Sequence, residues 1–168
     1  MQDFYRVKRM KISAQEEYGL RCLLQLAGLA ENESLTLPQI AGREGISVAN
    51  AGKLMWLLNK SGFVQATRGT KGGYSLARAA GEIRLSEVIK VLDADVLNKH
   101  CESYTGVLDN CVHKGDCGIR PVIVGLHEIV ENALSQITLA QLVGNEASVD
   151  ATFHQIQGIH RTIEPQGI

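Results

Sequence analysis

The chain has 168 residues, of which 45% are hydrophobic and 21% are charged, a balance that fits a folded protein and excludes wholesale disorder. Its longest apolar run, "LRCLLQLAGLA", is too short for a membrane span, and the polar, basic N-terminus lacks the apolar core of a secretory signal. We therefore expect a cytoplasmic protein with no membrane partner. Thiols stay reduced in the cytoplasm, so clustered cysteines favour a metal or redox site over a structural disulfide.

The net charge of −1 conceals an uneven distribution along the chain. Residues 1–78 hold 11 Lys and Arg against 6 Asp and Glu, a net charge of +5. Residues 79–168 hold 6 Lys and Arg against 12 Asp and Glu, a net charge of −6. This asymmetry predicts a basic half that binds a polyanion and an acidic half with a different role.

The first predicted element is a helix over about residues 13–30. Its apolar residues recur at helical spacing, and Ser13 followed by Glu16 is a capping-box pair that marks its start. A short second helix is predicted to begin near Pro38, a residue favoured in a first helical turn, and to end at Gly45.

A third helix and a hairpin follow. Ser47 is the predicted cap of the helix "VANAGKLMWLLNK", and Leu54, Leu57, Leu58 and either Trp56 or Met55 are expected on its buried side. The alternating segment "FVQATRGTKGGYSLA" predicts a β-hairpin with a glycine-rich tip. Three helices and a hairpin in this order are typical of a winged helix-turn-helix. A generic small α+β domain is the less favoured interpretation.

A short amphipathic helix at "LSEVIKVLD" precedes a polar segment over residues 93–117. A long helix comes next, and its apolar residues repeat at three- and four-residue steps from Ile119 to Ile137. This apolar stripe could pack back on the chain's own domain. Helix-turn-helix proteins generally bind DNA as two-fold dimers, however, so a second copy of the chain is the favoured partner. "TLAQLVGNE" predicts a last short helix, and residues 147–168 are expected to form a flexible tail.

The third helix and the hairpin carry the predicted DNA contacts. In a helix-turn-helix, the first turns of the second helix meet base edges in the major groove. The candidate contacts are Ser47, Val48, Asn50 and Lys53 on this helix, and Arg68 and Lys71 at the hairpin tip. Asparagine can pair with adenine, and glycines beside an arginine allow close approach to phosphate or the minor groove. Singly these are ordinary solvated residues, but together on the basic half they predict contact with double-stranded DNA.

Three cysteines crowd the polar segment, with the spacing C-x9-C-x5-C at Cys101, Cys111 and Cys117. Three thiolates on a loop suit an iron–sulfur cluster, which accepts another ligand type at one or two positions. Zinc suits them equally, with His113 or His100 as the fourth ligand, and a thiol-based redox switch is a third interpretation. The remaining cysteine, Cys22, lies on the apolar side of the first helix and is expected in the core.

The order of these segments resembles the family of bacterial winged-helix iron–sulfur transcription regulators that includes IscR and NsrR. The resemblance covers about residues 10–145 and rests on "MKISAQEEYGLRCLLQLA", "LPQIAGREGIS", "RGTKGGYSLAR", "LSEVIKVLDA", the three cysteines and "ITLAQLV". It implies a homodimer with crossing long helices, in which the cluster state controls DNA affinity or site choice. The ligands it implies are Cys101, Cys111 and Cys117, and Arg68 matches the minor-groove arginine of the wing. The family's start falls at Met10, so residues 1–9 resemble an N-terminal extension.

Two departures from the family pattern concern the fourth ligand. The IscR-type histidine, three residues after the last cysteine, is here Arg120, and the first gap holds nine residues where five is typical. Other members use a carboxylate early in the first helix of the partner subunit, which implies Glu17, ahead of His113 and His100. The competing interpretation makes Glu17 a solvated residue paired with Arg21. Whether the cluster is [2Fe–2S] or [4Fe–4S] stays open.

The prediction is a mainly α protein with a small β-hairpin wing. A winged helix-turn-helix domain is expected over residues 10–92, a cluster-binding loop over 93–117, and a dimerisation helix with a short helix over 118–146. The predicted function is a DNA-binding transcription regulator, a repressor, that senses iron–sulfur, redox or nitric oxide status through its cluster. The alternative is a zinc-stabilised or thiol-redox-switched regulator. No nucleophile–base pair, phosphate loop or H-E-x-x-H pattern indicates an enzyme.

Overall fold

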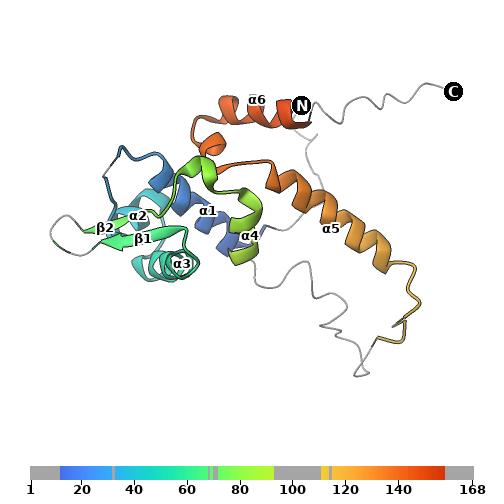
Figure 1. The fold of residues 1–168 in the computed structure, drawn as a ribbon. Helices are drawn as coiled ribbons and strands as arrows, with labels where there is room; N and C mark the ends of the chain where they lie inside the picture. Colours follow the sequence, from blue (N-terminus) through green and yellow to red (C-terminus); the bar gives the residue numbers. More distant parts are fainter. Residues whose placement is uncertain are drawn as a thin grey trace, which may run out of the picture.

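The computed structural model describes residues 12–31, 33–67, 69, 72–92, 111–113 and 115–157, and it is mainly helical with one small hairpin (Figure 1). The helices are α1 (Ala14–Ala27), α2 (Leu37–Glu44), α3 (Val48–Lys60), α4 (Leu85–Leu92), α5 (Arg120–Ser135) and α6 (Glu146–Gln157). The strands are β1 (Val64–Thr67) and β2 (Gly73–Leu76), and the 3-10 helices are η1 (Ala80–Glu82) and η2 (Leu139–Leu142). The predicted fold class, a winged helix with a long additional helix, is confirmed. The extension at residues 1–9, Arg68, Lys71, His100 and Cys101 lie outside the described residues.

Local capping signals set the start of α1 and the turn between α2 and α3. The Ser13 hydroxyl accepts a hydrogen bond from the Glu16 amide at 3.2 Å, and the Ser13 amide donates to the Glu16 carboxylate at 2.7 Å, so the predicted capping box is present. Gly45 ends α2 in the left-handed region, with φ of 66°, where a side chain would be strained. The start of α1 and the end of α2 could therefore be predicted from a few neighbouring residues.

The hydrophobic core lies where α1, α2, α3, the hairpin and α4 meet. Its fully buried members include Leu23, Ile40, Met55, Leu58, Val64, Ile83, Val88 and Leu92. Met55 takes the buried position on α3, whereas Trp56 is 62% exposed, so the first expectation, Trp56, was wrong and its alternative, Met55, was correct. Cys22 is fully buried as expected, and this burial, aided by the Glu44 charge, raises the pKa of its thiol to about 11.

The hairpin is an antiparallel pair in which Val64 lies opposite Leu76 and Thr67 lies opposite Gly73. A third segment joins it, because the Leu35 amide donates to the Tyr74 carbonyl at 3.0 Å and the Tyr74 amide donates back at 2.7 Å. A Cβ at Gly73 would lie 2.8 Å from the backbone carbonyl of Leu35, closer than real Cβ contacts come. A glycine at this position therefore lets the wing pack against the loop that precedes α2.

We expect the substitution Gly73→Ala to lower the free energy of unfolding by about 1–3 kcal/mol, since the new methyl group meets backbone that cannot rotate away. Chemical denaturation followed by circular dichroism measures the loss. Gly81→Ala is the matched control, because nothing lies within 4 Å of a Cβ built at Gly81. Equal stability of the two variants would contradict the steric role of Gly73.

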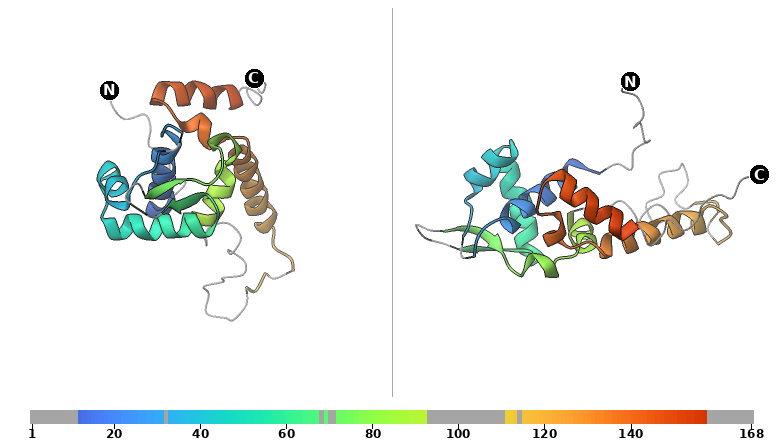
Figure 2. Two further views of the ribbon diagram at one scale, coloured as in Figure 1. Left: turned by 60° about the vertical axis from the view of Figure 1, so that its left-hand side comes forward. Right: turned by 90° about the horizontal axis from the view of Figure 1, so that it is seen from above.

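Helix α5 leaves the domain as a long arm, and its C-terminal half packs against α4 (Figures 1 and 2). Lys90 of α4 forms an ion pair with Glu131 of α5, and this contact lowers the pKa of the Glu131 carboxyl. The His127 Nε2 atom lies 3.4 Å from the same carboxylate. The Lys90–Glu131 pair thus links α4 to α5, whereas the His127–Glu131 contact lies within α5.

The end of α4 is held by α1. A Cβ at Gly19 would lie 2.5 Å from Leu92 Cδ2, so the leucine side chain fills the space that the glycine leaves. The Gln15 side-chain amide also donates to the Leu92 carbonyl at 2.6 Å. Leu92, the last described residue before the cysteine segment, is therefore anchored to α1, the first helix of the domain.

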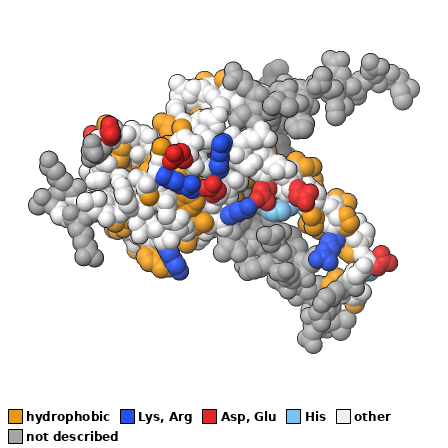
Figure 3. Space-filling view, viewed as in Figure 1, with side chains coloured by type: hydrophobic (Ala, Val, Ile, Leu, Met, Phe, Trp, Pro, Cys, Tyr) orange, Lys and Arg blue, Asp and Glu red, His pale blue; other side chains and the backbone are white. Residues whose placement is uncertain are grey.

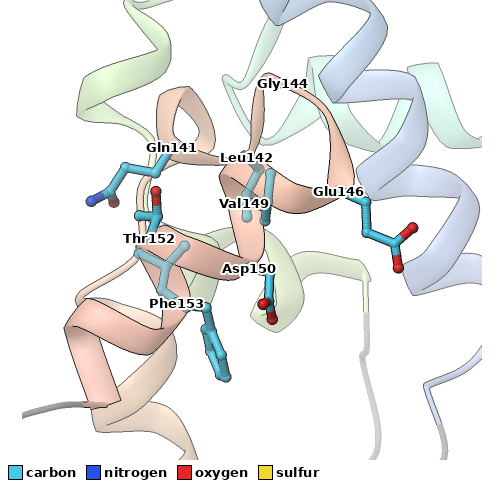
Figure 4. A pocket seen from close by; sticks show the side chains of 9 residues that line it. Gln141, Leu142, Gly144, Glu146, Val149, Asp150, Thr152 and Phe153 are labelled. Carbon is cyan, nitrogen blue, oxygen red and sulfur yellow. The ribbon is translucent and has the colours of Figure 1, made fainter.

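Helix α6 corrects the expectation of a tail without regular structure from residue 147. The Asn145 side chain accepts a hydrogen bond from the Ser148 amide at 2.9 Å and so caps the helix. Figure 4 shows Val149 and Phe153 of α6 beside a pocket that Leu142 of η2 also lines. The two apolar residues give too short a pattern to predict a helix, but they supply a side that packs on η2. Residues 158–168 lie outside the described residues.

Candidate nucleic-acid interface and cysteine segment

The sharp turn from α2 into α3 presents the beginning of α3 to solvent. The Ile46 amide donates to the Ala41 carbonyl at 3.1 Å, which closes the turn after Gly45. Ser47 then caps α3, because its hydroxyl oxygen accepts a hydrogen bond from the Asn50 amide at 3.2 Å. Ser47 therefore has a structural role that is independent of any contact with DNA.

The predicted reading residues of α3 lie together on its exposed side. Val48 is 48% exposed, and Asn50 and Lys53 are exposed as well. The opposite side of the same turns is buried through Ala51 and Leu54, which fix the rotation of the helix. The structure thus brings the candidate residues of the helix together at one solvent-facing end.

Trp56 extends this exposed side, and sequence reasoning missed it as a functional candidate. Its indole is 62% exposed, and the Lys60 ammonium lies 5.2 Å from the ring centroid. Beside it, Gln15, Ala49, Gly52, Lys53 and Leu57 line a shallow hollow. The signal that could have found Trp56 is its spacing from Lys53 and Lys60, which places all three on one side of a helix.

The wing is described up to its tip. Thr67 and Gly73 are the last paired residues of the two strands, and Arg68 and Lys71, between them in sequence, lie outside the described residues. The hairpin extends from the same domain as α3 (Figure 1). The structure therefore supplies the two-stranded scaffold of a wing.

The described part of the cysteine segment carries Cys111 and Cys117. Both thiols are free and both residues are partly exposed, in contrast to buried Cys22. A turn joins them, in which the Asp116 amide donates to the His113 carbonyl at 3.2 Å and Gly115 adopts φ of 106°. Within the described residues, no group of three or more potential metal ligands is assembled. Cys101 and His100 lie outside that part of the chain.

Glu17, the implied fourth ligand, forms an ion pair within its own chain. Its carboxylate accepts a hydrogen bond from the Arg21 guanidinium at 2.8 Å, and both side chains are about half exposed. This pairing matches the competing interpretation of Glu17. The exposed pair costs little to separate, since such surface ion pairs contribute only about 0–1 kcal/mol.

The arm formed by α5 carries a continuous apolar surface. Its exposed large side chains are Ile119, Val122, Ile123, Val124, Leu126 and Ile129. Figure 3 shows hydrophobic side chains along much of this arm, with a few charged side chains among them. A stripe of this kind marks an interaction surface. In the described part of the chain, no helix has the length and apolar character needed to cross a membrane.

Comparison with known proteins agrees with this architecture. The family described as "Rrf2: Iron-dependent Transcriptional regulator" matches residues 12–145. HTH-type transcriptional regulators IscR are similar: that of Cronobacter sakazakii is 30% identical, covering 94% of each chain, and that of Klebsiella pneumoniae is 31% identical, covering 88% of each.

Solved structures give the same result. IscR of T. potens has a TM-score of 0.63 and 28% identity, covering 80% of this chain and 86% of that one. CymR, the global cysteine regulator of B. subtilis, has a TM-score of 0.63 and 25% identity, covering 80% of this chain and 97% of that one.

Proposed function

Since this chain belongs to the Rrf2 family of DNA-binding transcription regulators, we propose that it binds DNA according to the state of an iron–sulfur cluster held by Cys101, Cys111 and Cys117. Its relatives regulate transcription, and the chain is not an enzyme. The regulation of DNA binding by a cluster is the part that goes beyond family membership.

The observation that carries the proposal is the state of Cys111 and Cys117. Two free, partly exposed thiols flank one turn, nine and three residues before α5 begins, so they are available as thiolate ligands where buried Cys22 is not. A carboxylate such as Glu17 is a hard ligand beside thiolates and would be the first to exchange. When bound, the cluster would supply a redox-active group that oxygen, nitric oxide or iron supply can alter.

The fourth ligand is proposed to come from the partner subunit. Glu17 lies in the first turn of α1, and the only partner it has in the described structure is Arg21 at its own surface. The apolar surface of α5 supports a homodimer, because pairing it with a second copy would cover residues that one chain leaves exposed. His113 is exposed near Cys111 and is the second choice as ligand.

The proposed DNA contacts follow from the exposed side of α3. Val48, Asn50 and Lys53 would meet base edges, and Ser47 would approach the backbone at the start of the helix. Arg68 and Lys71 of the wing would contact the minor groove or phosphates. Hydroxyl-radical footprinting on a selected operator tests this arrangement, and protection confined to one groove would contradict it.

The proposed regulation is a population shift between two dimer geometries. The cysteine segment joins α4, which packs on α1, to α5, which carries the dimer surface. Binding or loss of the cluster at these cysteines would therefore shift the winged-helix domain relative to α5 in each subunit. That shift would change the distance between the two α3 helices of the dimer. Only one distance fits two half-sites on the duplex.

The test is anaerobic purification followed by absorption and Mössbauer spectroscopy, with DNA binding measured before and after removal of iron. We expect a coloured protein with iron and sulfide in cluster proportions, and an operator affinity that differs between the two preparations. A colourless protein with stoichiometric zinc would favour the zinc-stabilised alternative. Equal operator affinity of both preparations would contradict the sensing role.

A further inference from the structure

The outer side of α3 carries a regular row of residues, Ala49, Lys53, Trp56 and Lys60, which we call the Trp56 row. The steps of four, three and four residues place their side chains along one side of a helix. The two lysines stand on either side of the tryptophan, and the row begins within the turns that carry the proposed base contacts. It therefore continues the DNA-facing side toward the end of the helix.

The exposure of Trp56 has no explanation within the fold. Tryptophan is the largest apolar side chain, and burial normally stabilises it, yet this one is 62% exposed while its neighbour Met55 is fully buried. Its described aromatic contact is with the Lys60 ammonium, 5.2 Å from the ring centroid. An exposed indole beside two cations suits a partner that is flat or apolar at one point and negatively charged beside it.

Gly52 gives a second, independent observation. A Cβ built at Gly52 would meet only a side-chain atom of Leu37 at 3.9 Å, which is an ordinary contact. Packing therefore does not require glycine at this place, although glycine inside a helix is less stable than alanine. Gly52 lines the hollow beside Trp56, together with Ala49 and Lys53. A glycine there leaves room for the close approach of a partner.

The dimensions of DNA identify what would fill this space. Trp56 lies eight residues after Val48, which at about 1.5 Å per residue is about 12 Å along the helix. The major groove is also about 12 Å wide. When the first turn of α3 meets base edges, Trp56 therefore stands at the edge of the groove, where deoxyribose rings and phosphates of one strand pass.

We propose that Trp56 packs against a deoxyribose at the edge of the major groove, over Ala49 and Gly52, while Lys60 pairs with a flanking phosphate. The proposal rests on the major-groove placement of α3 given under the proposed function, and it adds the sequence-independent contact that holds the helix there. It requires no cluster, because every residue of the Trp56 row belongs to the winged-helix domain.

The chain's single tryptophan makes the contact directly observable. Full-length protein is titrated at low salt with a random-sequence duplex of about 40 base pairs, long enough for two half-sites about one helical turn apart. We expect the tryptophan fluorescence to change in step with binding, and acrylamide quenching to fall. Binding seen by DNA anisotropy without any change at Trp56 would overturn the proposal. A change on raising the protein concentration without DNA would assign Trp56 to a second copy and overturn it too.

Three variants sharpen the result. We expect Trp56→Ala to weaken binding to random and selected DNA alike, by about tenfold per dimer, because each of the two subunits loses its weak contact with a deoxyribose. Lys60→Gln should lower the slope of log affinity against log salt by about 0.9 per subunit. Gly52→Ala should raise the melting temperature and still weaken DNA binding, a combination that a purely structural role does not produce.

Arg84→Gln is the charge control. Arg84 is exposed and forms a backbone bridge with Thr138, directly before η2, which contacts η1, α1 and α6. It should leave the salt slope unchanged. Measuring iron-free protein as well separates the cluster hypothesis from the Trp56 hypothesis. If the protein holds no cluster, all these effects on DNA binding should remain. If Trp56→Ala binds DNA like wild type while its cluster is intact, the Trp56 contact alone is overturned.

Discussion

Cys111→Ala is expected to remove essentially all visible absorbance from anaerobically purified protein and to reduce its iron content to background. Cys111 is a free, partly exposed thiol beside the turn that precedes α5, and the proposed site has no spare thiolate to replace it. Operator affinity of the variant should equal that of iron-free wild type. Absorption spectra, iron assays and fluorescence anisotropy on a selected operator measure the three quantities.

Cys22→Ala is the matched control for this experiment. Cys22 is fully buried in the core, out of reach of a metal ion, and this burial raises the pKa of its thiol to about 11. This variant should keep its absorbance and lose only about 1 kcal/mol of stability, from the small cavity left in the core. An iron content that is unaffected in Cys111→Ala would contradict the proposed ligand set.

Leu126→Glu is expected to convert the protein to a monomer and to weaken operator binding at least a hundredfold. Leu126 is 59% exposed on the outer side of α5, so the charge is tolerated in one chain but would be buried without a partner in the proposed dimer. A monomer keeps only one of two half-sites, which removes half of the contacts that hold a dimer on DNA. Sedimentation velocity and anisotropy measure the two effects.

Glu128→Ala on the same helix is the control for that substitution. Glu128 is exposed on the side of α5 opposite Leu126, so its loss should leave both the oligomeric state and DNA binding unchanged. The melting temperature of Leu126→Glu tests the fold. A Leu126→Glu protein that remains dimeric would place the subunit interface elsewhere.

Elements with local signals were predictable from the sequence. Ser13 with Glu16, Gly45 and the glycine-rich hairpin each fix a boundary through neighbouring backbone atoms. The choice between Met55 and Trp56 was not decided in this way. Both belong to the apolar run "LMWLL", and only the rotation of α3 against the core shows which of two adjacent residues is buried.

The features that depend on residues far apart in the sequence, or on a second chain, could not be predicted from the sequence. Asn145 caps α6, yet the helix holds its place mainly through a small contact with η2, which no periodic pattern announces. Glu17 and Arg21 sit four residues apart, so local reasoning predicts their ion pair, and the structure shows it. A ligand supplied by another subunit leaves no trace in the spacing of one chain.

The packing of Leu92 against Gly19 links the cysteine segment thermodynamically to the DNA-binding domain. Residue 93 begins the cysteine segment, and Leu92 before it is fitted into α1, which in turn packs on α3. If holding the cysteines alters this fit, and with it operator affinity by some factor, then operator DNA must alter the affinity of the cysteines for their ligand by that same factor. Reciprocity makes the regulator's genomic sites part of its sensor: a protein seated on its operator would respond at a different iron level from one free in solution.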